Sequence, residues 1–219
     1  MNEPFQATRA PNSKFLITLS GRSTRSTEAI RVLRTHVVTR HVQEGHRALA
    51  ICAASEGVGC TFVATNLAVA LSQIGINTLL IDADMRAPSI ANMFEYPVPD
   101  ADIRVALSSD INFYDCISGG ILPSLSVLFC GGVAENAQEL LAGSRFGALM
   151  DFCLRQFDAT IIDTPPANES SDARLISSTV GYSLIVTQRN KSLVNDIKLL
   201  AEQLRGDHAQ VIGTVLNKA

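Results

Sequence analysis

Residues 53–61 form a glycine-containing stretch with the residue types of a phosphate-binding loop. A short apolar run, residues 48–53, precedes it, and an apolar-rich helical stretch, residues 62–74, follows it. Between a strand and a helix, the backbone N–H groups of such a loop surround a polyphosphate at the helix N-terminus. The residues expected to hold a nucleotide are Gly57, Val58, Gly59, Cys60 and Thr61.

The loop lacks the lysine that normally reaches the β- and γ-phosphates, because Cys60 stands in that place. Thr61, which suits Mg²⁺ binding, is present. Losing a lysine–phosphate contact of about 1.5–3 kcal/mol would weaken binding about 10- to 150-fold, and would slow phosphoryl transfer further. A helix N-terminus can lower a thiol pKa, so Cys60 is either a neutral filler or a reactive thiol. The candidates for a substitute cation are Arg86 and Lys191.

Two further apolar runs end in carboxylates. The first ends at Asp82, and Asp84 follows two residues later, on the same side of an extended chain. The second ends at Asp163, before a Thr-Pro-Pro loop. Beside a phosphate loop, Asp82 and Asp84 suit Mg²⁺ and activation of an attacking group, and Asp163 suits a distal metal or water-positioning role. As an alternative, Asp82 and Asp84 only cap the loop that follows. The predicted metal ligands are Thr61, Asp82 and Asp163.

The elements that would position these groups are apolar runs that alternate with helical stretches. Strands are expected at residues 48–53, 78–82, 125–129, 159–163, 182–187 and 210–216. This alternation predicts an α/β fold with a doubly wound, mostly parallel sheet of the P-loop NTPase kind. Ligands of such sheets lie beyond the carboxyl ends of the strands, where the loop and both carboxylate motifs fall. Residues 96–124 contain prolines and glycines and are expected to form loops and short turns.

The composition is that of a soluble globular domain. The 219 residues are 47% hydrophobic and 18% charged, enough for one α/β domain with a full core. No apolar run approaches the roughly 18–20 residues that span a bilayer, and residues 1–14 lack the apolar segment of a signal peptide. The five cysteines are odd in number and form no CxxC pair, which favours reduced cytosolic thiols.

The net charge of −3 is unevenly distributed. Residues 1–47 hold eight basic and three acidic side chains, a net +5, so the remainder carries −8. We expect residues 1–25 to be a flexible basic leader and residues 26–219 to be a single domain. A basic arm on an acidic body favours contact with an anionic membrane surface or a neighbouring copy. A solvated extension without a partner is the alternative. The acidic body and few aromatics disfavour nucleic acid.

Residues 26–42 are expected to form a helix with a charged face. Glu28, Arg31 and Arg34 are spaced at i, i+3 and i+6, so they share much of one side. A carboxylate and two guanidinium groups placed there can pair with an acidic surface of a second subunit. The alternative is an intrahelical Glu28–Arg31 pair, worth only a few tenths of a kcal/mol.

The phosphate loop, residues 80–88 (Leu-Ile-Asp-Ala-Asp-Met-Arg-Ala-Pro) and residues 161–166 (Ile-Ile-Asp-Thr-Pro-Pro) together resemble the bacterial tyrosine kinases that regulate capsule and exopolysaccharide synthesis. In that family the three motifs are called Walker A, Walker A′ and Walker B. The family belongs to a deviant P-loop class that includes the MinD- and ParA-type ATPases. The resemblance extends from about residue 26 to residue 217, nearly the whole chain.

Three more segments resemble these kinases. Residues 28–34 match the Glu-x-x-Arg-x-x-Arg helix through which the kinase domains pack into rings, and residues 136–141 resemble an Asn-Pro-x-Glu-Leu-Leu segment with Ala137 for proline. Asn217 matches a strand-end asparagine that is expected to approach the adenine. The resemblance implies ATP or ADP with Mg²⁺ as cofactors, self-association through residues 28–34, and a membrane polysaccharide copolymerase or adaptor partner. It also implies a cytoplasmic location at the inner face of the membrane.

Two departures from the family shape the expected function. One is Cys60; the other is the end of the chain at Ala219 without a tyrosine-rich tail. The tyrosines are Tyr96, Tyr114 and Tyr182, so the family's tail autophosphorylation is not expected. We expect a pseudokinase-like regulator of polysaccharide synthesis and export, with weak or absent ATP turnover. The alternatives are an active tyrosine kinase or ATPase of the same pathway, and a MinD-like spatial regulator.

Overall fold

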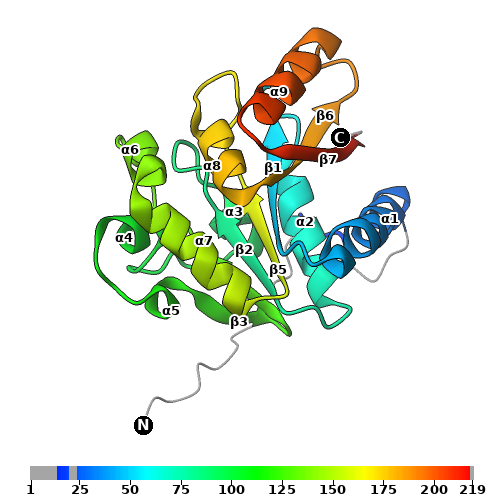
Figure 1. Cartoon of the computed structure of the whole chain (residues 1–219). Coiled ribbons are helices and arrows are strands. Elements are labelled where there is room, and N and C mark those ends of the chain that lie inside the picture. The colour runs from blue at the N-terminus through cyan, green and yellow to red at the C-terminus, as the bar shows by residue number, and fades with distance from the viewer. Residues whose placement is uncertain (1–13, 20–23, 218–219) are drawn as a thin grey trace.

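The computed structural model describes residues 14–19 and 24–217, and in them seven strands form one sheet (Figure 1). The strands are β1 (Ala48–Ala53), β2 (Thr78–Asp82), β3 (Ser118–Leu122), β4 (Leu125–Leu128), β5 (Ala159–Asp163), β6 (Tyr182–Gln188) and β7 (Gln210–Asn217). They lie in the order β3-β4-β2-β5-β1-β6-β7. The β3–β4 pair is antiparallel and the other pairs are parallel, which confirms the doubly wound, mostly parallel sheet.

Helices cover both faces of the sheet. They are α1 (Arg25–Arg40), α2 (Cys60–Ser72), α3 (Ile90–Phe94), α4 (Ile103–Ser108), α5 (Phe113–Cys116), α6 (Ala137–Ala142), α7 (Ser144–Gln156), α8 (Asp172–Val180) and α9 (Val194–Gly206). Helices α1, α2 and α3 pack into one apolar cluster, and α4 to α9 pack into a second on the opposite face. Figure 1 shows α1 and α2 side by side, away from α6, α7 and α8.

Strand β1 shows why its sequence is apolar at every position. All six of its residues are buried, and alternate residues enter opposite clusters. Ala48, Ala50 and Cys52 face the α4–α9 side, whereas Leu49 and Ile51 face the α1–α3 side. A parallel strand covered on both faces must be apolar throughout, because successive side chains point to opposite sides.

Residues 14–19, the described inner part of the expected leader, pack against α2. Leu16 is buried, the Asn66 side-chain amide donates to the Phe15 carbonyl at 2.9 Å, and that of Gln73 donates to the Thr18 carbonyl at 2.9 Å. The remainder of the leader, residues 1–13 and 20–23, lies outside the described residues. Within the described ranges, no helix is both long enough and apolar enough to cross a membrane.

Residues 96–124 contain more regular structure than loops and turns, so that expectation was wrong. Buried Asp102 caps α4 by accepting hydrogen bonds from the backbone N–H groups of Arg104 and Val105, at 2.6 and 3.3 Å. The turn into β4 places Ser124 at a φ of 59°, and β3 then pairs antiparallel at the edge of the sheet. These elements depend on a buried cap and on edge pairing, which the sequence pattern does not display.

Candidate functional site

The phosphate loop connects β1 to α2, as the sequence predicts. Helix α2 begins at Cys60, and Gly59 precedes it with a φ of 90°. Gly57 has a φ of 63°. Both conformations favour glycine, because a Cβ crowds the backbone at positive φ. The loop therefore bends so that the first turn of α2 opens toward the carboxyl edge of the sheet.

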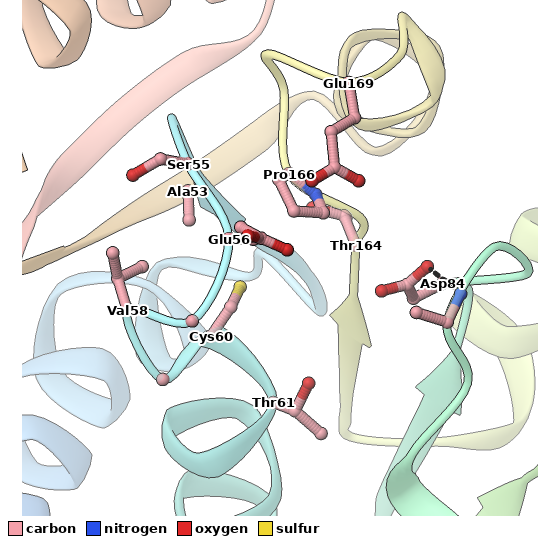
Figure 2. A pocket seen from close by; sticks show the side chains of 13 residues that line it. Ala53, Ser55, Glu56, Val58, Cys60, Thr61, Asp84, Thr164, Pro166 and Glu169 are labelled. Atoms are coloured by element: carbon pink, nitrogen blue, oxygen red, sulfur yellow. Dashed lines mark hydrogen bonds between the residues drawn. The ribbon is translucent and has the colours of Figure 1, made fainter.

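A cavity of about 270 Å³ lies in front of this loop. Its walls come from the loop and from the segments that follow β2 and β5, and they are formed by Ala53, Ser55, Glu56, Gly57, Val58, Gly59, Cys60, Thr61, Asp84, Ala87, Thr164, Pro166 and Glu169. Figure 2 shows the loop on one side of the cavity and Asp84 on the other. Six of the site residues predicted from the sequence therefore line this cavity.

The Cys60 side chain is turned toward the sheet. Its thiol donates to the carbonyl oxygen of Ile51 at 3.1 Å. Burial raises the pKa of this thiol well above its ordinary value, and the nearby Asp163 carboxylate raises it further. The raised pKa keeps the thiol in its neutral form and favours the filler interpretation of Cys60 over a reactive thiol. Position 60 supplies no positive charge to the cavity.

Asp82 and Asp163 lie side by side at the ends of β2 and β5, where they form a register pair of the parallel ladder. Both are buried. Burial raises the pKa of the Asp163 carboxyl to about 7, against the lowering effect of the Thr61 hydroxyl beside it. Burial also raises the pKa of Asp82 well above its ordinary value, and the charge of Asp163 adds to the effect. Two carboxyl groups are thus crowded into one buried site next to Thr61.

Asp82 and Asp84 also cap the loop between β2 and α3, so the cap alternative describes part of their role. One oxygen of Asp82 accepts hydrogen bonds from the N–H groups of residues 89 and 90, at 3.2 and 3.1 Å. One oxygen of Asp84 accepts from those of residues 86 and 87, at 3.1 and 2.9 Å. Asp84 lines the cavity, whereas Asp82 is buried and does not line it.

The remaining oxygens of Asp82 and Asp163 are of the type that binds Mg²⁺, although no cluster of three or more acidic, histidine or cysteine side chains arranged for a metal is found among the described residues. Among the described residues, Oδ1 of Asp82 and both carboxylate oxygens of Asp163 are buried without a hydrogen bond of ordinary geometry. Buried unpaired carboxylate oxygens are costly, and a divalent cation would relieve that cost. Hard oxygen ligands are the type that Mg²⁺ prefers. The predicted ligands Asp82 and Thr61 each lie beside Asp163, and Asp84 lies at the cavity wall, while their use by Mg²⁺ stays a prediction.

The two candidate substitute cations differ in their surroundings. Arg86 is held by the buried carboxylate of Asp172, with N–O distances of 2.7 and 3.3 Å, so its charge is already paired. The Lys191 ammonium lies against the loop, in the space that a Cβ on Gly57 would fill. Sequence reasoning missed Asp172, which opens α8 beyond the carboxyl end of β5, the edge where such sheets bind ligands.

Asn217 contacts the loop from the end of β7. Its side-chain amide donates to the Val58 carbonyl at 2.9 Å and occupies the space that a Cβ on Gly59 would fill. An asparagine at this position thus supports the loop directly. Its approach to an adenine stays a prediction.

The charged residues of α1 make contacts within the chain. Glu28 and Arg31 form an exposed ion pair at 2.5 Å, and Arg34 donates to the carbonyl of Ala70 on α2 at 3.3 Å. The intrahelical pair foreseen as the alternative is therefore present. The use of this face between subunits stays a prediction.

Four cavity residues that were not predicted as site residues come from segments in which the sequence shows no clear binding motif. Glu56 precedes the two loop glycines, and Thr164, Pro166 and Glu169 follow β5. Figure 2 shows the last three around one side of the cavity. Their position after strand ends was the available signal, because ligands of doubly wound sheets lie there.

Comparison with known proteins places this site in a family. The ParA family, described as NUBPL iron-transfer P-loop NTPase, matches residues 45–219. CapB of Staphylococcus aureus is 28% identical over 191 residues, which are 87% of this chain and 83% of CapB. The tyrosine-protein kinase CpsD of Streptococcus agalactiae is 32% identical over 173 residues, 79% of this chain and 76% of CpsD. The chain belongs to the bacterial tyrosine kinases within the ParA-like P-loop NTPases.

Solved structures of bacterial tyrosine kinases share the fold. The kinase domain of Escherichia coli tyrosine kinase ETK superimposes with a TM-score of 0.88 at 28% identity, covering 97% of this chain and 83% of ETK's. The cell-division ATPase MinD of Pyrococcus furiosus reaches 0.69 at 25% identity, covering 78% and 72%. EpsB of Ralstonia nicotianae, 30% identical over 88% of this chain, is matched over only 25% of its own length. The chain therefore matches most of the length of CapB but only about a quarter of the length of EpsB.

Proposed function

We propose that this chain is a nucleotide-binding regulator of polysaccharide synthesis and export that transfers phosphoryl groups poorly. The observation that carries this proposal is the contrast at the start of α2. Cys60 is neutral and bonded to the sheet, while Thr61 next to it lies beside the crowded Asp82 and Asp163 carboxylates. The site keeps its metal ligands and has lost the cation that acts on the transferred phosphate.

Nucleotide binding is supported by the loop and the cavity. The N–H groups of residues 57–61 surround the phosphates of ATP or ADP at the N-terminus of α2. Thr61, Asp82 and Asp163 would hold Mg²⁺, which would supply positive charge to the phosphates. Asp84, at the cavity wall, orients an attacking group. Asn217 supports the loop from β7 and lies near the adenine.

Poor transfer follows from the missing charge. A cation on the first turn of α2 would be fixed in place and would stabilise charge that develops on the phosphoryl group. A neutral thiol cannot do so. Retained binding with slow turnover gives a protein whose conformation reports nucleotide occupancy, which suits a regulator. An active tyrosine kinase or ATPase is the second candidate, favoured by the ammonium of Lys191 beside the loop.

Partners and location are proposed from the family. The domain of residues 26–219 self-associates through Glu28, Arg31 and Arg34 and docks on a membrane polysaccharide copolymerase or adaptor at the cytoplasmic face. The basic leader, residues 1–25, contributes to that contact through its charge. Nucleic acid is not a partner in this proposal.

The proposal is tested by calorimetry of Mg²⁺–ADP and Mg²⁺–ATP binding, followed by a turnover assay with labelled ATP. The variants are the wild type, Cys60→Lys, and Cys60→Met as the control with comparable reach and no charge. We expect the wild type to bind and to turn over slowly. Cys60→Lys should bind about 10- to 150-fold more tightly and turn over faster, whereas Cys60→Met should not. Absence of binding in all three would refute the nucleotide role, and fast wild-type turnover would favour the active enzyme.

A further inference from the structure

Lys191 lies in a short turn that follows β6. The turn is closed by the backbone N–H of Ser192, which donates to the Gln188 carbonyl at 3.0 Å, and by the Ser192 hydroxyl, which accepts from the Gln188 N–H at 2.9 Å. The N–H of Lys191 also donates to the Gln188 carbonyl, at 3.3 Å. The backbone from which the Lys191 side chain starts is therefore held in place. Strand β6 neighbours β1, so this turn and the phosphate loop share one edge of the sheet.

The ammonium of Lys191 reaches the phosphate loop itself. It occupies the position that a Cβ on Gly57 would take, so a larger residue there would displace it. Gly57 has a φ of 63°, which disfavours other residues independently. The loop backbone and the ammonium are thus in direct contact at a residue that lines the cavity.

The charged side chains that line the cavity are all acidic, so a cation near the cavity would be needed to attract an anionic ligand. Glu56, Asp84 and Glu169 line the cavity, and among the described lining residues there is no basic side chain. Arg86 is paired with buried Asp172. Lys191 forms no ion pair with any carboxylate of the described residues, so its charge is available to an anionic ligand.

We propose that Lys191 contacts the phosphates of the bound nucleotide in place of the lysine that is absent at position 60. This inference rests on the proposed nucleotide binding and names the cation that sustains it. Lysine acts as a point charge on a flexible four-carbon stem, so an ammonium that rests on Gly57 in the free protein can move onto a phosphate. Because the stem starts from an exposed turn, the ammonium is less constrained than a side chain on the first turn of α2. That arrangement supports binding more than transfer.

The test is calorimetry of Mg²⁺–ADP binding to Lys191→Met, with Lys198→Met as the matched control. Lys198 is an exposed lysine of α9, and unlike Lys191 it does not lie against Gly57. We expect Lys191→Met to bind about 10- to 100-fold more weakly and Lys198→Met to change by less than about twofold. Adding Cys60→Lys to Lys191→Met should restore binding, because either ammonium can serve the phosphates. Thermal unfolding of each variant checks that Lys191→Met remains folded.

The outcomes separate this inference from the proposed function. Wild-type binding that Lys191→Met leaves unchanged would overturn the role of Lys191 while nucleotide binding stands. Binding by Cys60→Lys but not by the wild type would show that Lys191 does not substitute. No binding by either would remove the nucleotide role and this inference with it. An equal loss of affinity for adenosine would assign Lys191 to the nucleoside and would also overturn it.

Discussion

Asp82 and Asp163 are register partners at the carboxyl ends of β2 and β5, and both are buried. The N–H of Ala83 donates to the backbone carbonyl of Asp163 at 3.0 Å, which continues the ladder past the end of β2. The sheet thus holds two acidic side chains together at its centre, next to the first turn of α2. Such crowding destabilises the free protein, and bound Mg²⁺ at the proposed site would relieve it; carboxyl groups with shifted pKa values are common at functional sites.

We predict that the free energy of unfolding of the metal-free protein depends on pH through the Asp163 carboxyl group. Its pKa is raised from 3.8 to about 7, so the folded state holds this proton more tightly than the unfolded state. Stability therefore falls as pH rises from about 4 to about 7 and then levels off. Asp163→Asn should remove the part of this slope that comes from Asp163 and reduce the part that comes from Asp82, and it should stabilise the protein at pH 8 on the order of 1–4 kcal/mol at about 1.4 kcal/mol per pKa unit. Urea unfolding between pH 5 and 8 measures how the free energy of unfolding changes with pH, with exposed Asp151→Asn as the control. The same pH dependence in the wild type and in Asp163→Asn would contradict the prediction.

Asn217→Ala tests the support of the loop from β7. The variant loses the 2.9 Å hydrogen bond to the Val58 carbonyl and leaves space above Gly59. We expect Mg²⁺–ADP affinity to fall by about 5- to 10-fold, since such a bond contributes about 1 kcal/mol. Calorimetry measures it, with exposed Asn195→Ala on α9 as the control. Unchanged affinity would mean that the loop keeps its shape without Asn217.

The ion pair between Arg86 and Asp172 is predicted to stabilise the fold. Arg86→Met would leave a buried carboxylate without its partner, at a cost of about 1–3 kcal/mol. Adding Asp172→Asn should recover part of this loss, and the double-mutant cycle gives the coupling. By contrast, Arg31→Met in the exposed Glu28–Arg31 pair should cost less than about 0.5 kcal/mol. Urea unfolding of the variants measures these losses of stability. An equal loss for Arg86→Met and Arg31→Met would contradict the stabilising role of the Arg86–Asp172 pair.

Two glycines are predicted to respond oppositely to alanine. Gly59→Ala should destabilise the protein by about 1–2 kcal/mol, because its φ is 90° and the Asn217 amide fills the Cβ position. Gly147→Ala should stabilise it by about 0.5–1 kcal/mol, because Gly147 lies within α7 with open space around it. Each kcal/mol shifts Tm by about 2–4 °C in a chain of this size, which thermal unfolding resolves. A stabilised Gly59→Ala would contradict the loop geometry.

We predict that a charge change on the exposed face of α1 affects self-association but not the stability of the monomer. Arg31→Glu should abolish self-association, because it reverses a charge on the proposed interface, while thermal unfolding of the monomer changes little. Sedimentation velocity over a concentration series measures the association. Arg40→Glu, in the last turn of the same helix, is the control. Association that survives Arg31→Glu would place the interface elsewhere.

Much of the framework could be predicted from the chain alone. The bounds of β1, β2 and β5 follow from apolar runs that end at a glycine loop or an aspartate, and the structure confirms them. Fully buried parallel strands leave a strong signal, because they must be apolar on both faces. The edge strand β3 has no such signal, since its stability comes from pairing with β4. It was missed for that reason.

The sequence by itself determined the fold class, the family, and the set of loop and carboxylate residues, because those depend on residue type and on spacing along the chain. Only the tertiary structure decided which of these groups meet. It turned the Cys60 thiol toward Ile51, paired Arg86 with Asp172, and brought Lys191 onto Gly57. Residues as distant along the chain as Gly57 and Lys191 become neighbours because parallel strands align their carboxyl ends at one edge of the sheet.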